Sequence, residues 1–360
     1  MNLKLYKTYI LKSYLYYFLL ISLIFFILSF FLNILEEIVF FEKYNISIGY
    51  PFLLTFLNTP SILFEIFPFI FLITSQLFFI KFHENEELNL LKITGIDNLS
   101  LISFLIFVSF VMGLIITIFF YTFSANLKFN YLSIKNKFTN DNKYLAAIND
   151  NGLWIKDEYK ENTYIINADE FKNNKLSNIT INLLNEEFEL KSIIISEEAD
   201  IEDVEWKLKN VKIFYTDGKK DLLDNLNVNT NFNREKLNSI FSNLTSLNII
   251  QLINLTEDYK KLGLSNIEIK SHLYKLYSFP IFVTVMATIG SVLMLAFNYK
   301  KSKFFNLSIG IIFSVIIYYI NYFFNLLGLT EKTSLLLSIG APLIILILFC
   351  TILLVRINER

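Results

Sequence analysis

Cysteine and histidine are almost absent from this sequence, because its 360 residues include one Cys and two His. A single cysteine cannot form an intrachain disulfide, and Cys350 lies inside an apolar run, so no cysteine-based metal site is expected. His83 and His272 lie in separate segments, and His83-Glu84 lacks the second histidine that a zinc-binding helix requires. The sequence therefore predicts neither a disulfide framework nor a metal centre.

Motifs for nucleotide binding and hydrolysis are missing as well. The sequence contains no GxxxxGK[ST] phosphate-binding loop, no GxSxG nucleophile elbow and no CxxC pair. Its net charge of -1 offers no basic surface for nucleic acid. We therefore expect a protein that is not an enzyme, that binds neither a cofactor nor nucleic acid, and that relies on a separate protein for any ATP hydrolysis.

Charged residues are scarce too, at 18% of the chain, whereas 54% is hydrophobic and 17% is aromatic. This composition is too apolar for a soluble domain and predicts a membrane protein. A helix that crosses a bilayer needs about 20 apolar residues. Six segments are long enough, at about residues 14–35, 51–80, 99–122, 277–297, 304–327 and 335–355. The first is too long for a signal peptide and lacks a cleavage pattern after it.

The positive residues of the short loops predict the orientation of these spans, because Lys and Arg mark the cytoplasmic side. One side carries ten of them, and the opposite side has only Lys43 and Lys332. The ten are Lys4, Lys7, Lys12, Lys81, Lys92, Lys300, Lys301, Lys303, Arg356 and Arg360. We therefore expect both termini in the cytoplasm and the long polar region after the third span outside it.

The long polar region, residues 124–271, is expected to form a domain of its own. Between residues 144 and 232 it consists of short strand-like segments separated by turns, among them an Asp217-Gly218 hairpin turn. Such spacing predicts a β-sandwich or jellyroll. Trp154 and Trp206 lie in these segments and are expected to pack in the β core, with ligand stacking as the alternative. A helix is predicted after the strands, over residues 246–262.

The stretch KFHENEELNLLKITGID, residues 81–97, predicts a short helix on the cytoplasmic surface between the second and third spans. It has acidic residues at its start, Lys92 in its last turn and Gly95 where a helix-ending glycine belongs. By the spacing of three and four, one face carries Glu84, Glu87, Leu88 and Leu91. We expect this face to dock an ATPase, since the chain has none.

Three acidic residues lie near or inside the outer ends of the first two spans, namely Glu36, Glu37 and Glu65. A charge at membrane depth costs a few kcal/mol unless it faces protein or water, so such residues are functional candidates. The alternative is that Glu36 and Glu37 simply lie in a loop at the level of the lipid headgroups. The second span also contains Pro60 and Pro68, which predict a kinked or interfacial first part.

Taken together, the chain resembles the LptF/LptG permeases of the lipopolysaccharide exporter and is most like the LptG member. The resemblance covers nearly the whole length and rests on the order and spacing of several motifs. They are FEIFPF (64–69), EELNLLKITGI (86–96), NGLWIKD (151–157), EWKLKNV (205–211) and DYKKLGL (258–264). It implies six transmembrane helices, three before and three after an inserted periplasmic β-jellyroll domain. The corresponding domains are residues 1–123, 124–271 and 272–360.

The resemblance further implies a function and partners. The chain would be an inner-membrane permease subunit of an ABC transporter that extracts lipopolysaccharide and passes it through the jellyroll toward the outer membrane. The implied partners are an LptB-like ATPase dimer, an LptF-like second permease subunit and an LptC-like periplasmic bridge protein. The family's coupling-helix glutamate falls on Glu87.

The outer end of the first span departs from LptG relatives, which carry basic residues there that meet lipid phosphates. This sequence has Asn33, Val39 and Phe40 in that neighbourhood, with only Lys43 nearby. We assign the substrate path to Asn33, Glu36, Glu37, Lys43 and Glu65. Two other functions stay open, a membrane sensor or structural protein with an extracytoplasmic β domain, and a permease for another lipid or a lipoprotein. A sensor would need a cytoplasmic output module, and the longest cytoplasmic segment here is residues 81–97.

Overall fold

The computed structural model describes residues 3–42, 47, 49–136, 138, 153–159, 162–172, 175–185, 189–232, 243–261, 265–296 and 303–358. The chain divides into two compact units. We call residues 1–128 together with 270–360 the membrane unit, and residues 129–269 the β unit.

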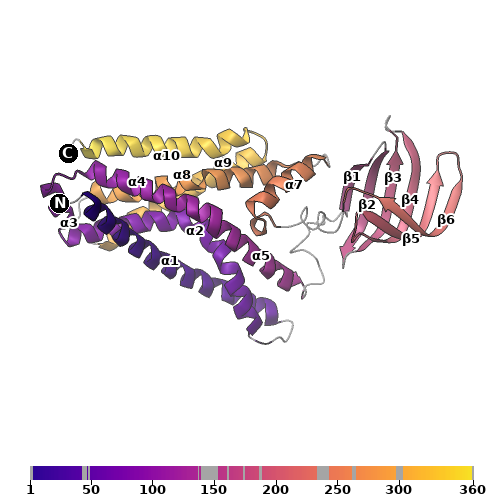
Figure 1. Ribbon diagram of the computed structural model, residues 1–360, viewed down its shortest axis with the longest axis horizontal. Helices are drawn as coiled ribbons and strands as arrows, with labels where there is room; N and C mark the ends of the chain where they lie inside the picture. The colour runs from indigo at the N-terminus through magenta and orange to yellow at the C-terminus, as the bar shows by residue number, and fades with distance from the viewer. Residues whose placement is uncertain are drawn as a thin grey trace. The chain divides into compact units, whose positions relative to one another are not determined.

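Six long apolar helical runs confirm the six predicted spans, and each is long and apolar enough to cross a membrane. In chain order the elements of these runs are α1 (Leu3–Glu42), α2 (Gly49–Glu84), α4 (Asn98–Ile115) with η1 (Ile116–Phe120) and α5 (Tyr121–Asn136), α8 (Ile267–Ala296), α9 (Lys303–Leu329) and α10 (Leu335–Asn358) (Figure 1). The shorter helices are α3 (Glu87–Ile93), η3 (Leu244–Ser246) and α7 (Ile249–Lys261). The third run is helical throughout, with the π-helical turn η1 between α4 and α5.

Two of the helical runs continue well beyond their predicted ends. Helix α1 extends past residue 35 to Glu42, so Glu36 and Glu37 lie in a helix and not in a loop. The third run extends past residue 122 to Asn136. Hydropathy marks only the apolar part of a helix, whereas polar residues such as Lys128 continue it without loss of backbone hydrogen bonds.

Helix α2 is the most enclosed element of the membrane unit. Its buried residues include the consecutive run from Ile70 to Gln76, which spans almost two helical turns and so points in all directions around the axis. A helix that is apolar all round belongs inside a bundle. Aromatic contacts attach it to its neighbours, with Phe18 of α1 stacked on Phe67, and Phe64 stacked on Phe279 of α8 at 4.5 Å between ring centroids.

Helices α1, α9 and α10 show the opposite pattern, since large apolar side chains cover their outer faces. Examples are Leu19, Leu23, Ile27 and Phe31 of α1, Tyr318, Tyr319, Tyr322 and Phe323 of α9, and Ile344, Leu348 and Ile352 of α10. Apolar surface of this extent is characteristic of contact with lipid or with another membrane protein.

The β unit contains a six-stranded antiparallel sheet (Figure 1). Its strands are β1 (Leu153–Tyr159), β2 (Asn162–Lys172), β3 (Lys175–Leu184), β4 (Leu190–Asp200), β5 (Glu205–Tyr215) and β6 (Lys220–Asn229). The predicted insertion of an antiparallel β domain between the third and fourth spans is thus confirmed. The described strands follow one another in sequence order, as a meander; among them we see no strand order of the jellyroll kind. The predicted hairpin turn is present between β5 and β6, where Gly218 has φ +83°.

One face of the sheet is a continuous apolar surface. A cross-strand row of five buried isoleucines runs over it, formed by Ile155, Ile166, Ile181, Ile194 and Ile213. Side chains alternate between the faces of a strand, so this row places every second residue of each strand on the same side. Strand order and register therefore follow from burying the isoleucines together.

Two asparagines in the left-handed conformation interrupt the sheet, Asn178 with φ 51° and Asn210 with φ 53°. Each is bonded to a carboxylate on the neighbouring strand: Asn178 Nδ2 donates to Asp169 at 3.0 Å, and Asn210 Nδ2 donates to Glu197 at 2.7 Å. Asparagine tolerates this conformation better than most residues because its short polar side chain can hydrogen-bond locally.

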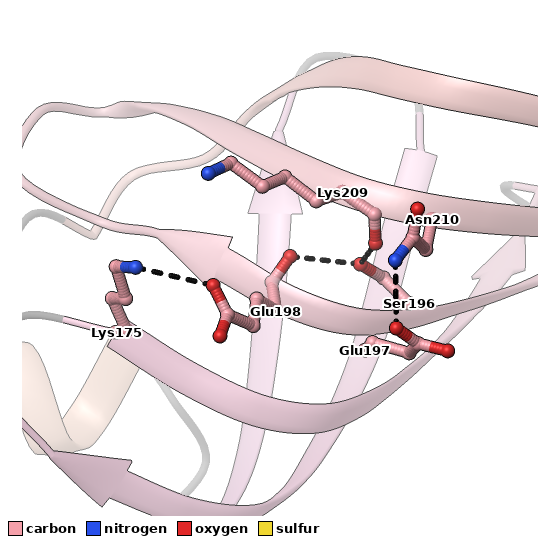
Figure 2. Close-up of polar contacts among 6 residues, drawn as sticks. All are labelled: Lys175, Ser196, Glu197, Glu198, Lys209 and Asn210. Atoms are coloured by element: carbon pink, nitrogen blue, oxygen red, sulfur yellow. Dashed lines mark hydrogen bonds and ion pairs between the residues drawn. The ribbon is translucent and has the colours of Figure 1, made fainter.

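The Ser196 hydroxyl replaces ladder bonds at this interruption (Figure 2). Its Oγ lies within hydrogen-bond distance of two backbone carbonyls, those of Glu198 at 2.9 Å and Lys209 at 2.6 Å, which share its single O–H donor. Lys175 Nζ lies 3.1 Å from the Glu198 carboxylate on the exposed side. Carbonyls that the irregular ladder would leave without a partner are satisfied in this way.

We expect Asn210→Gly to be tolerated and Asn210→Val to destabilise the β unit, by about 1–2 kcal/mol relative to the glycine variant, because a β-branched residue is strained at positive φ. Both tryptophans of the chain lie in β strands, so tryptophan fluorescence during thermal unfolding of the full-length protein reports this unit. Lys212 is the control in the same strand, where the order should reverse and valine should exceed glycine. Equal effects of valine at the two positions would contradict the assignment.

Candidate functional site

Helix α3 is a short helix closed by Gly95. Its first turn follows Glu86, which has φ 57°, and Gly95 has φ +84° at the other end. The Ile96 N–H donates to the Leu91 carbonyl and the Gly95 N–H to the Lys92 carbonyl, both at 3.0 Å. This pair of bonds is the Schellman motif, which favours glycine at the left-handed position. The predicted role of Gly95 as the helix end is therefore confirmed.

The apolar stripe of α3 faces the bundle. Leu88 is only 8% exposed and belongs to a buried cluster with Tyr6, Phe82 and Leu101, and Leu91 packs against the same cluster. The stripe that the sequence analysis expected to dock an ATPase thus contacts α1, α2 and α4 of its own chain. Spacing along a helix shows which residues share a face, but it does not show what that face meets.

The carboxylate of Glu87 also faces other residues of the membrane unit. Its Oε1 accepts a hydrogen bond from Asn85 Nδ2 at 3.1 Å, and its Oε2 is buried. The phenols of Tyr9 and Tyr17 on α1 lie close enough to interact with this carboxylate. Glu84, in contrast, is exposed and pairs with Lys81 at 3.1 Å.

The opposite face of α3 is exposed and partly apolar. Leu90 is 61% exposed and Ile93 is 82% exposed, and the exposed Glu86 and Asn89 lie on the same face at helical spacing. Leu90 and Ile93 were not among the residues that the sequence analysis selected. We call Glu86, Asn89, Leu90 and Ile93 the outer face of α3.

Asp97 fixes the chain where α3 leads into α4. Its carboxylate accepts a hydrogen bond from the Ser100 N–H at 3.1 Å and caps the start of α4. The hydrogen bonds from Ser100 lower the pKa of Asp97 below its ordinary value, because they favour the charged form. A carboxylate with a lowered pKa supports the fold at neutral pH, and this support is lost as the pH falls through the lowered value.

A second group of polar residues lies in the membrane unit on α1, α2, α5 and α8. Asn58 Nδ2 donates to Asn33 Oδ1 at 3.2 Å, and Lys128 Nζ donates to Asn58 Oδ1. Glu65 of α2 lies within electrostatic reach of both Lys128 and Lys275. We call Glu65, Lys128 and Lys275 the charged cluster.

Lys128 and Lys275 were likewise not predicted from the sequence. Each is a single lysine at the margin of an apolar run, and a sequence pattern does not show that the third and fourth spans bring them to the same glutamate. His272 lies nearby on α8, where its Nε2 is 2.9 Å from the Tyr121 hydroxyl. The structure thus adds two cations to a region where the first span supplies none.

The remaining predicted residues are placed as follows. Glu36 is exposed and Glu37 is 1% exposed on α1, while Lys43 lies outside the described residues. Trp154 is in β1 opposite Asn167. Trp206 is completely buried, and its indole N–H donates to the Phe232 carbonyl at 2.7 Å, which fits a core residue. Within the described residues no three His, Cys, Asp or Glu side chains could hold a metal ion.

A comparison with protein families finds a match to the family described as "Lipopolysaccharide export system permease LptF/LptG" over residues 8–356. The chain belongs to this family. LptF/LptG permeases are non-catalytic transmembrane subunits of an ABC transporter, so the chain is a multi-pass membrane protein of the lipopolysaccharide export system. A comparison with curated proteins found no match.

Truncating a leucine to alanine should have a large effect on one face of α3 and a small effect on the other face in this LptF/LptG permease. Leu88→Ala removes buried contacts and should destabilise the membrane unit by about 2–5 kcal/mol, whereas Leu90→Ala should change its stability by less than about 0.5 kcal/mol. Thermal unfolding followed by far-ultraviolet circular dichroism, which reports mainly the helices, measures both. Greater destabilisation by Leu90→Ala would show that α3 faces the other way.

Proposed function

We propose that this LptF/LptG permease is an LptG-type subunit that extracts lipopolysaccharide from the inner membrane, with both termini and α3 in the cytoplasm and the β unit in the periplasm. The family match over nearly the whole chain carries the proposal. The orientation is supported by the ten positive residues against two in the short loops. The partners are an LptB-like ATPase dimer, an LptF-like second permease subunit and an LptC-like bridge protein.

The physical chemistry of the substrate favours a continuous apolar route. Each acyl CH₂ group exposed to water costs about 0.8 kcal/mol, so a lipid with several chains has to move from one apolar surface to the next. The outer faces of α1 and α9 and the isoleucine face of the sheet supply such surfaces in the two units. We propose that they form successive parts of the lipid path.

The outer face of α3 is the best candidate for the ATPase contact. It presents Leu90 and Ile93 to solvent beside the carboxylate of Glu86. An exposed apolar pair with an acidic neighbour fits a groove with an apolar floor and a basic rim. Glu84, the last residue of α2, is also exposed, whereas Leu88 and Leu91 pack against the bundle, Glu87 faces α1 and Gly95 ends the helix.

Leu90→Asp with Ile93→Asp should abolish recovery of the ATPase when the permease is purified from cells that co-express both proteins, because two buried charges would replace apolar contacts. Val204→Asp, which places the same charge at an exposed apolar residue just before β5, is the control and should leave recovery unchanged. Normal ATPase recovery with the double variant would contradict the assignment of the ATPase contact to the outer face of α3.

The charged cluster is the best candidate for contact with the phosphates of lipopolysaccharide. Lys128 and Lys275 come from two different spans and reach the same region, where Asn58 accepts a hydrogen bond from Lys128 and Glu65 lies within electrostatic reach of both lysines. Two ammonium groups with one carboxylate leave a positive balance, which an anionic headgroup would compensate. These lysines take the place of the basic residues that the first span lacks.

Lys128→Gln with Lys275→Gln should weaken photo-crosslinking of the permease to lipopolysaccharide and reduce the stimulation of ATP hydrolysis by this lipid, about ten-fold for each 1.4 kcal/mol of lost binding. Lys332→Gln, which removes one exposed lysine from the loop before α10, is the control. Unchanged crosslinking in the double variant would place the headgroup elsewhere.

A further inference from the structure

Three consecutive polar residues are buried in the second half of α2, namely Thr74, Ser75 and Gln76, each with no exposed surface. Ser75 belongs to a hydrogen-bonded group in which the Tyr14 hydroxyl lies 3.1 Å from Ser75 Oγ and 3.2 Å from Ser109 Oγ. That group joins α1, α2 and α4. Gln76 points elsewhere, toward α9.

Gln76 forms a close contact with α9. Its Nε2 donates to the backbone carbonyl of Asn306 at 3.1 Å. One helical turn later, a Cβ at Gly310 would collide with the Gln76 amide group. Gly310 therefore leaves room for the Gln76 amide group, which would have to shift if residue 310 carried a side chain, and Gln76 lies against the backbone of α9 at residues 306 and 310.

Only some of the polar atoms in this contact between Gln76 and Asn306 are hydrogen-bonded. Gln76 Oε1 and Asn306 Oδ1 are both buried and have no hydrogen-bond partner among the described residues. A buried polar atom without a partner costs about 1–3 kcal/mol, and such atoms are uncommon in folded proteins. The Asn306 side chain also carries an amide NH₂ group, which is a hydrogen-bond donor. A shift of α9 against α2 that brought this group to Gln76 Oε1 would give the pair a second arrangement, which the structure does not show.

The position of the pair links the two parts of the membrane unit that transport has to connect. Gln76 precedes the end of α2 at Glu84 by eight residues, or about 12 Å of helix, and α3 follows directly. Helix α9, in contrast, exposes most of its apolar surface, including Tyr318, Tyr319 and Tyr322. Apolar contacts alone would let α9 slide, because lipid replaces them at little cost.

We propose that Gln76 is a positioning residue of the transport reaction, through which movement of α2 and α3 reaches α9 by exchange between the two arrangements of Gln76 and Asn306. This inference rests on the proposed function, because it assigns to Gln76 the step between ATPase docking and movement of the lipid-facing helix. We call Gln76, Asn306 and Gly310 the α2–α9 joint.

Gln76→Leu is the decisive variant, because it keeps the size of the side chain and removes both its hydrogen bond and its unpartnered oxygen. The permease, purified with its co-expressed ATPase and placed in vesicles that contain lipopolysaccharide, should keep its thermal stability and its ATP hydrolysis. The lipid moved per ATP should fall at least about five-fold, the low end of coupling between protein sites. Gly310→Ala should lower the same ratio from the α9 side.

Thr74→Val is the matched control, because it also removes a buried polar atom that has no hydrogen-bond partner among the described residues. Thr74 lies two residues before Gln76 and therefore on another face of α2. Its lipid-to-ATP ratio should stay at the wild-type value. A wild-type ratio in Gln76→Leu, or an equal fall in Thr74→Val, overturns the joint. A wild-type complex that hydrolyses ATP and moves no lipid overturns the proposed function and the joint with it.

Discussion

The burial of α2 on all sides is the constraint on which the rest of the membrane unit depends. A helix in a bilayer gains no hydrophobic free energy by leaving lipid for protein, so its neighbours are selected by close packing and by hydrogen bonds. Helix α2 uses both: Phe64 stacks on α8, Ser75 bonds to α1, and Gln76 bonds to α9. Because Ser75 and Gln76 are consecutive and bond to different helices, the sequence of one element specifies the arrangement of several others.

The β unit is stabilised differently, because the exposed face of its sheet meets water and not lipid. Its strands bury one face and leave the other to water, so the register is held by the isoleucine row and not by polar contacts. Polar groups matter where the ladder fails: the Ser196 hydroxyl bonds to carbonyls at the Asn210 irregularity, and the indole of Trp206 bonds to the Phe232 carbonyl. Each of these bonds gives a buried polar group a hydrogen-bond partner where the regular ladder does not provide one.

The sequence was sufficient for features that depend on local chemistry. Apolar length predicts the six spans, and glycine at positive φ predicts the end of α3 at Gly95 and the hairpin at Gly218. It was insufficient wherever two distant segments decide the outcome. The burial of Leu88 depends on how α1, α2 and α4 pack around it, and the approach of Lys128 and Lys275 to Glu65 depends on how three helices cross.

A transporter of this kind has to pass movement across a helix bundle without opening the bundle to water. The two polar contacts of α2, with Tyr14 and with Asn306, differ in how well they suit this requirement. The Tyr14 group is satisfied, because each hydroxyl has a partner, so any displacement breaks bonds and the contact resists motion. The Gln76 contact has unused acceptors, so a displacement can exchange one hydrogen bond for another at little net cost. The first contact therefore suits a fixed part of the bundle, and the second suits the place where one helix moves against its neighbour.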